Sequence, residues 1–365
     1  MALSQMGSLN ALEQCKGNSF WRRWLGSHVP SADTVGRVFA KLDCDRVRAI
    51  LRHTYTRLKR NKALRPAFGE VFALIIDGHE SNSSYLRSCP GCLKRTVETK
   101  EGERIQYYHR NVTAMLLAKD FPVLLDFESQ QPGEDEVATA MRLTRRVLEN
   151  YPRAFSLVLG DGLYARAPFF RLVLDHGKHV IAVLNDERRE VVKDAEGLFR
   201  AEEPLVSQHG STQRQCWDIE EFNSWPQVGQ DVRVVRSLET TTLRRQMDDR
   251  QEEHTTDWIW ATTPSKKEMS TEPVVDLGHA RWEIENKELN ELVTWWYADH
   301  LYKHHPVAIT AFWLLVMLAY NLFHAFIHLN LKPEIRFSRT KRHWACTVTA
   351  EIYYWDASHL LPVPT

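Results

Sequence analysis

Short apolar runs without a helical period divide the middle of the chain, and such runs predict buried strands. Three charged or small residues, 118–120, separate two of these runs and predict a hairpin between them. The runs expected to form strands are residues 71–76, 106–117, 122–127, 155–159 and 179–184.

Amphipathic stretches predict helices around these strands. Residues 1–65 are expected to be helical, with Ser31 as the N-cap of one helix. The acidic run Gly133-Glu-Asp-Glu136 suits the positive end of a helix dipole and predicts a helix after the hairpin. Pro168 and Gly177 fit the first turn and the end of the next helix. Residues 279–304 are expected to form one long helix.

Two polar stretches lack these patterns. Residues 78–103, rich in Ser, Gly and Cys, are expected to be a loop, and residues 186–275 a small β-rich insertion. The resulting division has a helical, basic N-terminal region, a core in two parts around the insertion, and a basic tail. Its boundaries are 1–65, 66–185, 186–275, 276–331 and 332–365.

The predicted order β-β-β-α-β-α-β, followed by the insertion and a helix, matches an α/β fold of the ribonuclease-H-like kind. In this arrangement a mixed sheet is flanked by helices, and the first strand lies beside the fourth. The fold class therefore brings the ends of the strands 71–76 and 155–159 together.

Residues 306–331 contain no Asp, Glu, Lys or Arg, and by length they could span a bilayer. However, Asn321, His324 and His328 recur at helical spacing and place one polar stripe on the apolar helix. We expect a central core helix and no membrane, with a membrane anchor as the alternative.

Charge is balanced over the 365 residues, with 47 basic and 47 acidic side chains, but it is unevenly distributed. Eight Lys or Arg and no acid lie between Arg46 and Arg65, and five basic residues lie in 332–342. Such stretches indicate either a polyanion-binding surface or solvated helix faces. The six cysteines are scattered and no leader is recognisable, which favours a reducing cytosol.

Three acids have unusual local contexts. Asp77 and Asp161 each close an apolar run, and Glu285 lies in a helical stretch. Carboxylates gathered in this way hold divalent cations that act on phosphoryl groups. Taken singly, each has a simpler explanation: Asp77-Gly78 and Asp161-Gly162 are common turn dipeptides, and Glu285 is spaced to pair with Arg281. Asp126, Glu128 and Glu80 are weaker candidates for the same site.

The motif set resembles the DDE transposases of bacterial insertion sequences, in the cut-and-paste branch with a β-rich insertion before the last acid. The spacings of the acids agree in kind, with 84 residues from Asp77 to Asp161 and 124 from Asp161 to Glu285. The motifs that carry the resemblance are Ile-Ile-Asp77-Gly-His-Glu, Gln106-Tyr-Tyr-His-Arg110, Gly133-Glu-Asp-Glu136, Asp161-Gly-Leu-Tyr-Ala165 and Arg281-Trp-Glu-Ile-Glu285-Asn.

The resemblance implies a transposase that cuts double-stranded DNA at element ends and joins it to target DNA, working as a homodimer on DNA. It implies two Mg²⁺ ions, with Mn²⁺ as a substitute, and a bacterial, nucleoid-associated location in the cytoplasm. Asp77, Asp161 and Glu285 would bind the metals. The expected DNA contacts are Arg281, Trp282, Lys287, His109, Arg110 and Lys303. A transposase-derived DNA-binding protein without catalysis is the alternative.

The chain departs from the wider signature of related enzymes, which carry a Tyr before the Arg and a Lys after the Glu. Gly278 and Leu292 stand at those positions. Trp282, Trp295 and Trp296 are candidates for stacking on an extruded base, with core packing as the alternative.

The pair Cys89-Pro-Gly-Cys92 would need further ligands, from His79, His109 or Cys44, to bind zinc. Two unliganded loop thiols are the alternative for this motif.

Overall fold

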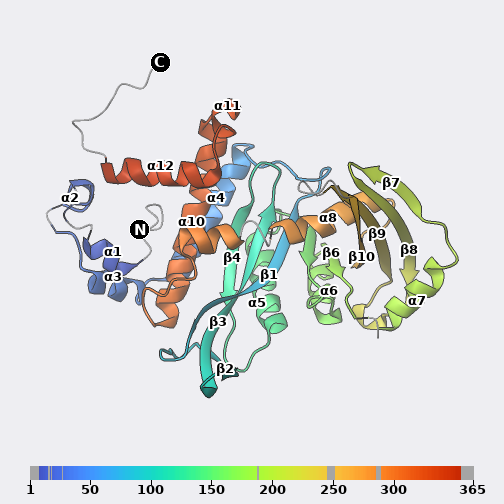
Figure 1. The fold of residues 1–365 in the computed structure, drawn as a ribbon, viewed down its shortest axis with the longest axis horizontal. Coiled ribbons are helices and arrows are strands. Elements are labelled where there is room, and N and C mark those ends of the chain that lie inside the picture. The colour runs from blue at the N-terminus through green and yellow to red at the C-terminus, as the bar shows by residue number, and fades with distance from the viewer. Residues whose placement is uncertain are drawn as a thin grey trace. The chain divides into compact units, whose positions relative to one another are not determined.

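The computed structural model describes residues 8–14, 17, 19–26, 28–186, 189–244, 251–284 and 289–354. Two compact units divide these residues and share the strand β1 (Ala73–Ser84), whose first five residues belong to one unit and the remainder to the other. The first unit contains residues 1–65, 78–139 and 286–365, and the second contains 66–77 and 140–285 (Figure 1).

The first unit combines a hairpin with most of the helices. Strands β2 (Leu93–Thr99), β3 (Gly102–Leu117) and β4 (Val123–Ser129) pair antiparallel in sequence order. The predicted hairpin is therefore confirmed. The helices of this unit are α1 (Leu9–Gln14), α2 (Ser19–Leu25), α3 (Ala32–Phe39), α4 (Cys44–Arg60), α9 (Asn290–Trp296), α10 (Pro306–Asn330), α11 (Pro333–Arg336) and α12 (Lys341–Tyr354).

The second unit is built on parallel strands extended by an antiparallel meander. Strand β5 (Leu157–Gly160) pairs parallel with both β1 and β6 (His179–Val183). The other elements are α5 (Glu136–Asn150), which begins in the first unit, α6 (Ala167–Leu174), α7 (Glu190–Phe199), β7 (Leu205–His209), β8 (Thr212–Phe222), the 3₁₀ turn η3 (Pro226–Val228), β9 (Val232–Arg244), β10 (Gln251–Thr262) and α8 (Thr271–Ile284).

Hydrogen bonding orders the strands β2-β3-β1-β5-β6-β10-β9-β8-β7, with β4 on β3. This mixed sheet with flanking helices confirms the expected α/β, ribonuclease-H-like fold, including the adjacency of the first and fourth predicted strands. The β-rich segment 205–262 does not stand apart from the sheet, because β10 pairs antiparallel with β6.

Two expectations about local structure were wrong. Residues 78–103 are not one loop, since β1 continues to Ser84 and β2 pairs along its whole length with β3. The end of β1 and strand β2 are largely polar, so pairing with neighbouring strands stabilises them. Their sequences lack the alternating apolar pattern by which a strand is predicted. The long helix over 279–304 is also absent: α9 ends at Trp296, and Tyr297 follows it in the left-handed region at φ 51°.

Local capping was easier to predict. The Ser31 hydroxyl accepts a hydrogen bond from the backbone N–H of Thr34 at 3.2 Å, which makes it the N-cap of α3 as expected. Pro306 opens α10 in the same way that Pro168 opens α6, because proline tolerates the first turn of a helix.

Helix α10 is long and apolar enough to cross a membrane, but 67% of its most apolar window is buried inside the protein. It packs beside α4 and β4 within the first unit (Figure 1). Its polar stripe has partners. The Asn321 side chain hydrogen-bonds both backbone groups of Leu124, and His324 lies 3.0 Å from Glu291. The buried polar residues are thus accounted for by packing within the unit.

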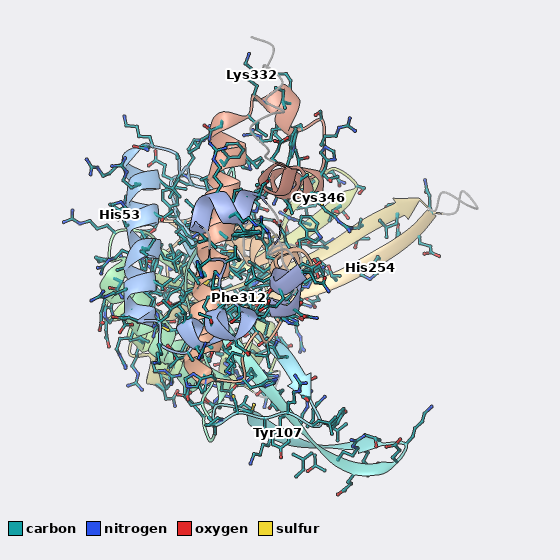
Figure 2. All side chains as sticks on the ribbon, turned by 90° about the vertical axis from the view of Figure 1, so that its left-hand side faces the viewer. His53, Tyr107, His254, Phe312, Lys332 and Cys346 are labelled. Carbon is teal, nitrogen blue, oxygen red and sulfur yellow. The ribbon has the colours of Figure 1, made fainter. Side chains whose placement is uncertain are left out.

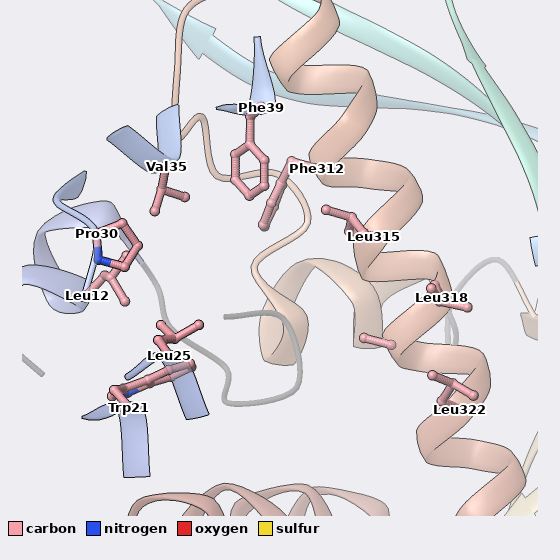
Figure 3. A pocket seen from close by; sticks show the side chains of 11 residues that line it. Leu12, Trp21, Leu25, Pro30, Val35, Phe39, Phe312, Leu315, Leu318 and Leu322 are labelled. Carbon is pink, nitrogen blue, oxygen red and sulfur yellow. The ribbon is translucent and has the colours of Figure 1, made fainter. Parts of the chain in front are cut away.

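An apolar groove of about 420 Å³ separates α10 from the N-terminal helices in the first unit. Figure 3 shows Trp21 and Val35 on one wall, and Leu315, Leu318 and Leu322 along α10 on the other. Its lining is almost entirely hydrocarbon and offers little to a polar ligand.

Candidate metal and DNA site

Asp77 and Asp161 stand at matching positions on neighbouring parallel strands. Ala73 pairs with Leu157, and Ile75 pairs with Leu159, an offset of 84 residues. Asp161 follows Asp77 by the same 84 residues. Residues in register on parallel strands lie on the same face, and the strands are about 4.8 Å apart. The strand pairing therefore directs both acids to one edge of the second unit's sheet.

Asp77 is not part of a turn. Strand β1 runs straight through Asp77-Gly78, which removes the turn-dipeptide explanation for this acid. Its side chain is buried, and its Oδ1 lies 3.5 Å from Nη1 of Arg281 on α8. A carboxylate at this depth needs a cation or hydrogen-bond donors nearby.

Asp161 does occupy a turn at the end of β5. Its Oδ1 accepts a hydrogen bond from the backbone N–H of Leu163 at 2.9 Å. The next residue, Gly162, packs closely on Asn185, since a Cβ there would lie 2.5 Å from Nδ2 of that side chain. Asn185 follows β6, so its amide joins Asp161 at the same edge of the sheet. Asn185 is not among the site residues expected from the sequence, although this polar residue directly follows the predicted strand 179–184.

In the first unit, a network of charges surrounds the residue that follows Asp77. A Cβ on Gly78 would overlap with the Glu136 carboxylate, which therefore packs directly on this glycine. Arg110 on β3 holds Glu136 with its Nη1 at 3.2 Å and approaches Glu80 at 3.9 Å. Arg95 also binds Glu80, through two contacts of 2.7 Å. Arg110 is thus oriented by two carboxylates and remains about one-third exposed.

The other expected DNA contacts are distributed unevenly. Trp282 on α8 is 55% exposed, whereas Trp296 is buried against Tyr320 and Phe323 and belongs to the core. Lys303 is exposed in the segment before α10. His109 is buried and faces two cysteine sulfurs, a position without access to DNA. Glu285 and Lys287 lie outside the described residues.

The weaker acidic candidate Asp126 has a structural role. Its side chain is buried, and its Oδ1 accepts hydrogen bonds from Nε of Arg48 at 3.1 Å and from the backbone N–H of Phe127 at 2.8 Å. This ion pair joins α4 to β4 and explains why an acid can be tolerated there.

The N-terminal basic stretch forms one face of α4. Val47, Leu51, Tyr55 and Leu58 are buried on the opposite face. In Figure 2 the helix that carries His53 extends long side chains into solvent. Within the described part of the chain, Arg57, Arg60 and Lys62 are exposed and form no ion pair.

The donor set at the strand ends suits a hard divalent cation. Asp77 and Asp161 offer carboxylate oxygens and Asn185 an amide oxygen, and oxygen ligands are what Mg²⁺ takes. Arg281 supplies a positive charge beside the Asp77 carboxylate and suits a phosphate group.

The mixed sheet, with one aspartate inside β1 and the other directly after the adjacent parallel strand β5, defines a ribonuclease-H-like protein. The chain belongs to the family of transposase DDE domains, whose sequence model matches residues 93–322. That range includes Asp161 and Glu285 and begins after Asp77. Members of this family are transposases, enzymes that act on DNA and generally use divalent metal ions. No curated protein matches the chain.

Proposed function

We propose that this chain is the transposase of a bacterial insertion sequence, cleaving DNA at the element ends and joining the freed strand to target DNA. The parallel register that aligns Asp77 with Asp161 carries the proposal. Two aspartates at one sheet edge, together with a nearby arginine, are more than a structural turn requires.

In this proposal Asp77, Asp161 and Glu285 hold two Mg²⁺ ions, for which Mn²⁺ can substitute. When bound, such ions activate the attacking hydroxyl and stabilise the leaving oxygen. Arg281 keeps the Asp77 carboxylate oriented and binds a DNA phosphate. Asn185, beside Asp161, hydrogen-bonds an oxygen of the DNA backbone.

DNA is held by several surfaces in this proposal. Trp282, exposed on α8, stacks on an unpaired base near the cleavage point. Arg110 and Lys303 bind phosphates, as does Lys287. The exposed Arg57 and Arg60 near the end of α4, with Lys62 just after it, provide sequence-independent affinity.

Two chains are expected to act together, because transposition joins two element ends. The protein then works as a homodimer on double-stranded DNA in the bacterial cytoplasm, associated with the nucleoid. The burial of α10 supports a core role for this helix, with no membrane insertion.

Cleavage of a labelled element-end duplex tests the proposal. Asp77→Asn, Asp161→Asn and Glu285→Gln should each abolish Mg²⁺-dependent cleavage while binding to the same duplex persists. Glu98→Gln, which changes an exposed acid on β2, is the matched control and should cleave normally.

Full cleavage by all three variants would overturn the assigned site. Binding of element-end DNA by the wild-type protein without cleavage in either Mg²⁺ or Mn²⁺ would instead favour the non-catalytic DNA-binding protein.

A further inference from the structure

A second cluster of metal-ligating side chains lies in the first unit and has no part in DNA cleavage as proposed above. Cys89, Cys92 and His109 bring their ligand atoms within 4.8 Å of one another. The two Sγ atoms are 3.5 Å apart, and Nε2 of His109 lies 3.4 Å from Cys89 and 3.3 Å from Cys92. The three atoms form a nearly equilateral triangle.

These distances suit a tetrahedral zinc ion. With Zn–S bonds of about 2.3 Å and Zn–N bonds of about 2.0 Å, tetrahedral ligands lie about 3.5–3.8 Å from one another. The observed edges are at or slightly below that spacing, so a cation can enter with small adjustments of the side chains. Soft thiolates with an imidazole favour zinc over the hard ions expected at the strand ends.

The local backbone is arranged to support a metal-bound thiolate. Pro90 and Gly91 form a tight turn between the cysteines, and the N–H of Cys89 donates a hydrogen bond to Sγ of Cys92 at 3.1 Å. Hydrogen bonds to the charged form of a group stabilise it. Both cysteines are free, and His109 approaches each of them equally, a feature that a disulfide-forming pair would not require.

The segment before α10 brings further histidines to this cluster. A Cβ on Gly91 would lie 3.5 Å from Cγ of Pro306 and 3.8 Å from Cε1 of His109, so Pro306 packs on the cysteine turn. Nδ1 of His304 and Nδ1 of His305 are both buried, without a hydrogen-bond partner in the described structure. Of the two histidines, His304 is the one whose charge acts on the His109 ring, so it lies near the cluster.

We propose that Cys89, Cys92 and His109, with His304 as the fourth ligand, bind a structural Zn²⁺ ion. Structural zinc sites are closed by four protein ligands, whereas catalytic sites keep an open position. The first three ligands are already assembled, and the unpartnered Nδ1 of His304 completes the set.

Such an ion would connect three segments far apart in the sequence: the turn before β2, strand β3, and the chain entering α10. Binding free energy at a structural zinc site contributes to folding stability. His109 precedes Arg110, so the ion also fixes the strand that carries a proposed DNA contact.

Metal content and a cobalt spectrum test the proposal on the full-length protein. Wild type, purified under reducing conditions, should carry one zinc per chain, and Co²⁺ alone should give the strong visible bands of tetrahedral cobalt with thiolate charge transfer. Cys89→Ser and Cys92→Ser should lose both signals. Cys346→Ser, which changes an exposed cysteine on α12, is the matched control and should keep them.

The fourth ligand is tested by comparing adjacent histidines. His304→Ala should weaken zinc retention against a competing chelator at least tenfold and alter the cobalt bands, whereas His305→Ala should do neither. The reverse pattern would overturn the assignment of His304.

Wild-type protein that holds no zinc and gives no thiolate–cobalt absorption would overturn the site itself. Zinc content and the cobalt spectrum do not depend on DNA cleavage, so their outcome is distinguishable from a failure of the proposed transposase activity. A thermal unfolding experiment on the wild type avoids the problem of variants that fail to fold. Removal of the metal by a chelator should lower the unfolding temperature of the wild-type protein.

Discussion

Nη1 of Arg281 lies 3.5 Å from Oδ1 of Asp77, and both side chains are more than nine-tenths buried. This contact joins the helix α8 to the carboxyl-terminal end of the β1 segment in the second unit. It links two motifs that are separated by 204 residues in the sequence and that the resemblance had assigned to the same reaction.

Removing the guanidinium should therefore affect both stability and cleavage. Arg281→Gln removes a buried cation from beside the Asp77 carboxylate and should cost about 3–5 kcal/mol of unfolding free energy, as for other broken buried pairs. Mg²⁺ should raise the unfolding temperature of this variant more than that of wild type, because the cation replaces the lost charge. Calorimetry with and without Mg²⁺ measures the difference. An equal response of both proteins would contradict a metal role for Asp77.

The exposed basic residues at the end of α4 should bind DNA through phosphates. Changing Arg57, Arg60 and Lys62 to Gln removes three charges, which should reduce the slope of log affinity against log salt by about 2–3. Fluorescence anisotropy at several salt concentrations measures this slope. The matched control changes three exposed basic residues of the second unit, Arg171, Lys193 and Arg200, and should leave the slope nearly unchanged.

Trp260 explains why this chain lacks a Tyr at position 278. A Cβ on Gly278 would lie 2.5 Å from the indole of Trp260, which is fully buried and stacks on Trp258. Gly278→Tyr should destabilise the protein by about 3 kcal/mol or more through overpacking. The double variant Gly278→Tyr with Trp260→Ala should be more stable than the sum of the single changes predicts. Additive effects in denaturant unfolding would show that the two positions do not compete for space.

Asn321 protects the outer edge of β4. Its Nδ2 donates to the carbonyl of Leu124 at 2.8 Å, and its Oδ1 accepts from the N–H of Leu124 at 2.9 Å. Asn321→Leu leaves both buried backbone groups without partners and should cost about 2–5 kcal/mol. The adjacent change Leu322→Ala, on the exposed side of α10, is the control and should cost far less in the same unfolding measurement.

His328 should make the protein sensitive to acid. Burial and the positive charge of Arg336 lower the pKa of His328 to about 4, helped by His324 and Lys341 and opposed by Asp120. The unfolded chain binds this proton near pH 6.5, so it holds more protons than the folded chain between pH 6.5 and 4, and stability falls across that window. Because the ring is only partly buried, solvent screening reduces the expected loss to about 1–2 kcal/mol.

The variant His328→Gln isolates this effect. It should show a shallower loss of unfolding free energy between pH 6.5 and 4 than wild type. Parallel curves for the two proteins would show that the imidazole does not titrate as described. His343→Gln, at an exposed histidine of α12, should retain the wild-type slope.

Much of the local structure was predictable because its causes are local. Ser31 caps α3 through its own hydroxyl, the apolar runs pair as strands, and the acidic run at Glu136 opens α5. The wrong predictions concern segments whose sequence carries no local signal for the structure they adopt. Strand β2 is mostly polar and depends on β3, and the break after Trp296 follows from a left-handed Tyr297 that no breaker residue marks.

The sequence by itself placed Asp77 and Asp161 directly after apolar runs that form buried strands, because such a run and the polar residue after it are set by neighbouring residues. Asp161 does follow the end of β5, whereas β1 continues past Asp77 to Ser84. Tertiary structure alone decided that the strands pair in parallel with the offset that aligns these acids. Tertiary structure also places His109, and neither His79 nor Cys44, beside Cys89 and Cys92. His79 packs against Trp313 instead. Such choices depend on hydrogen bonding and close packing between distant segments, which local sequence patterns do not encode.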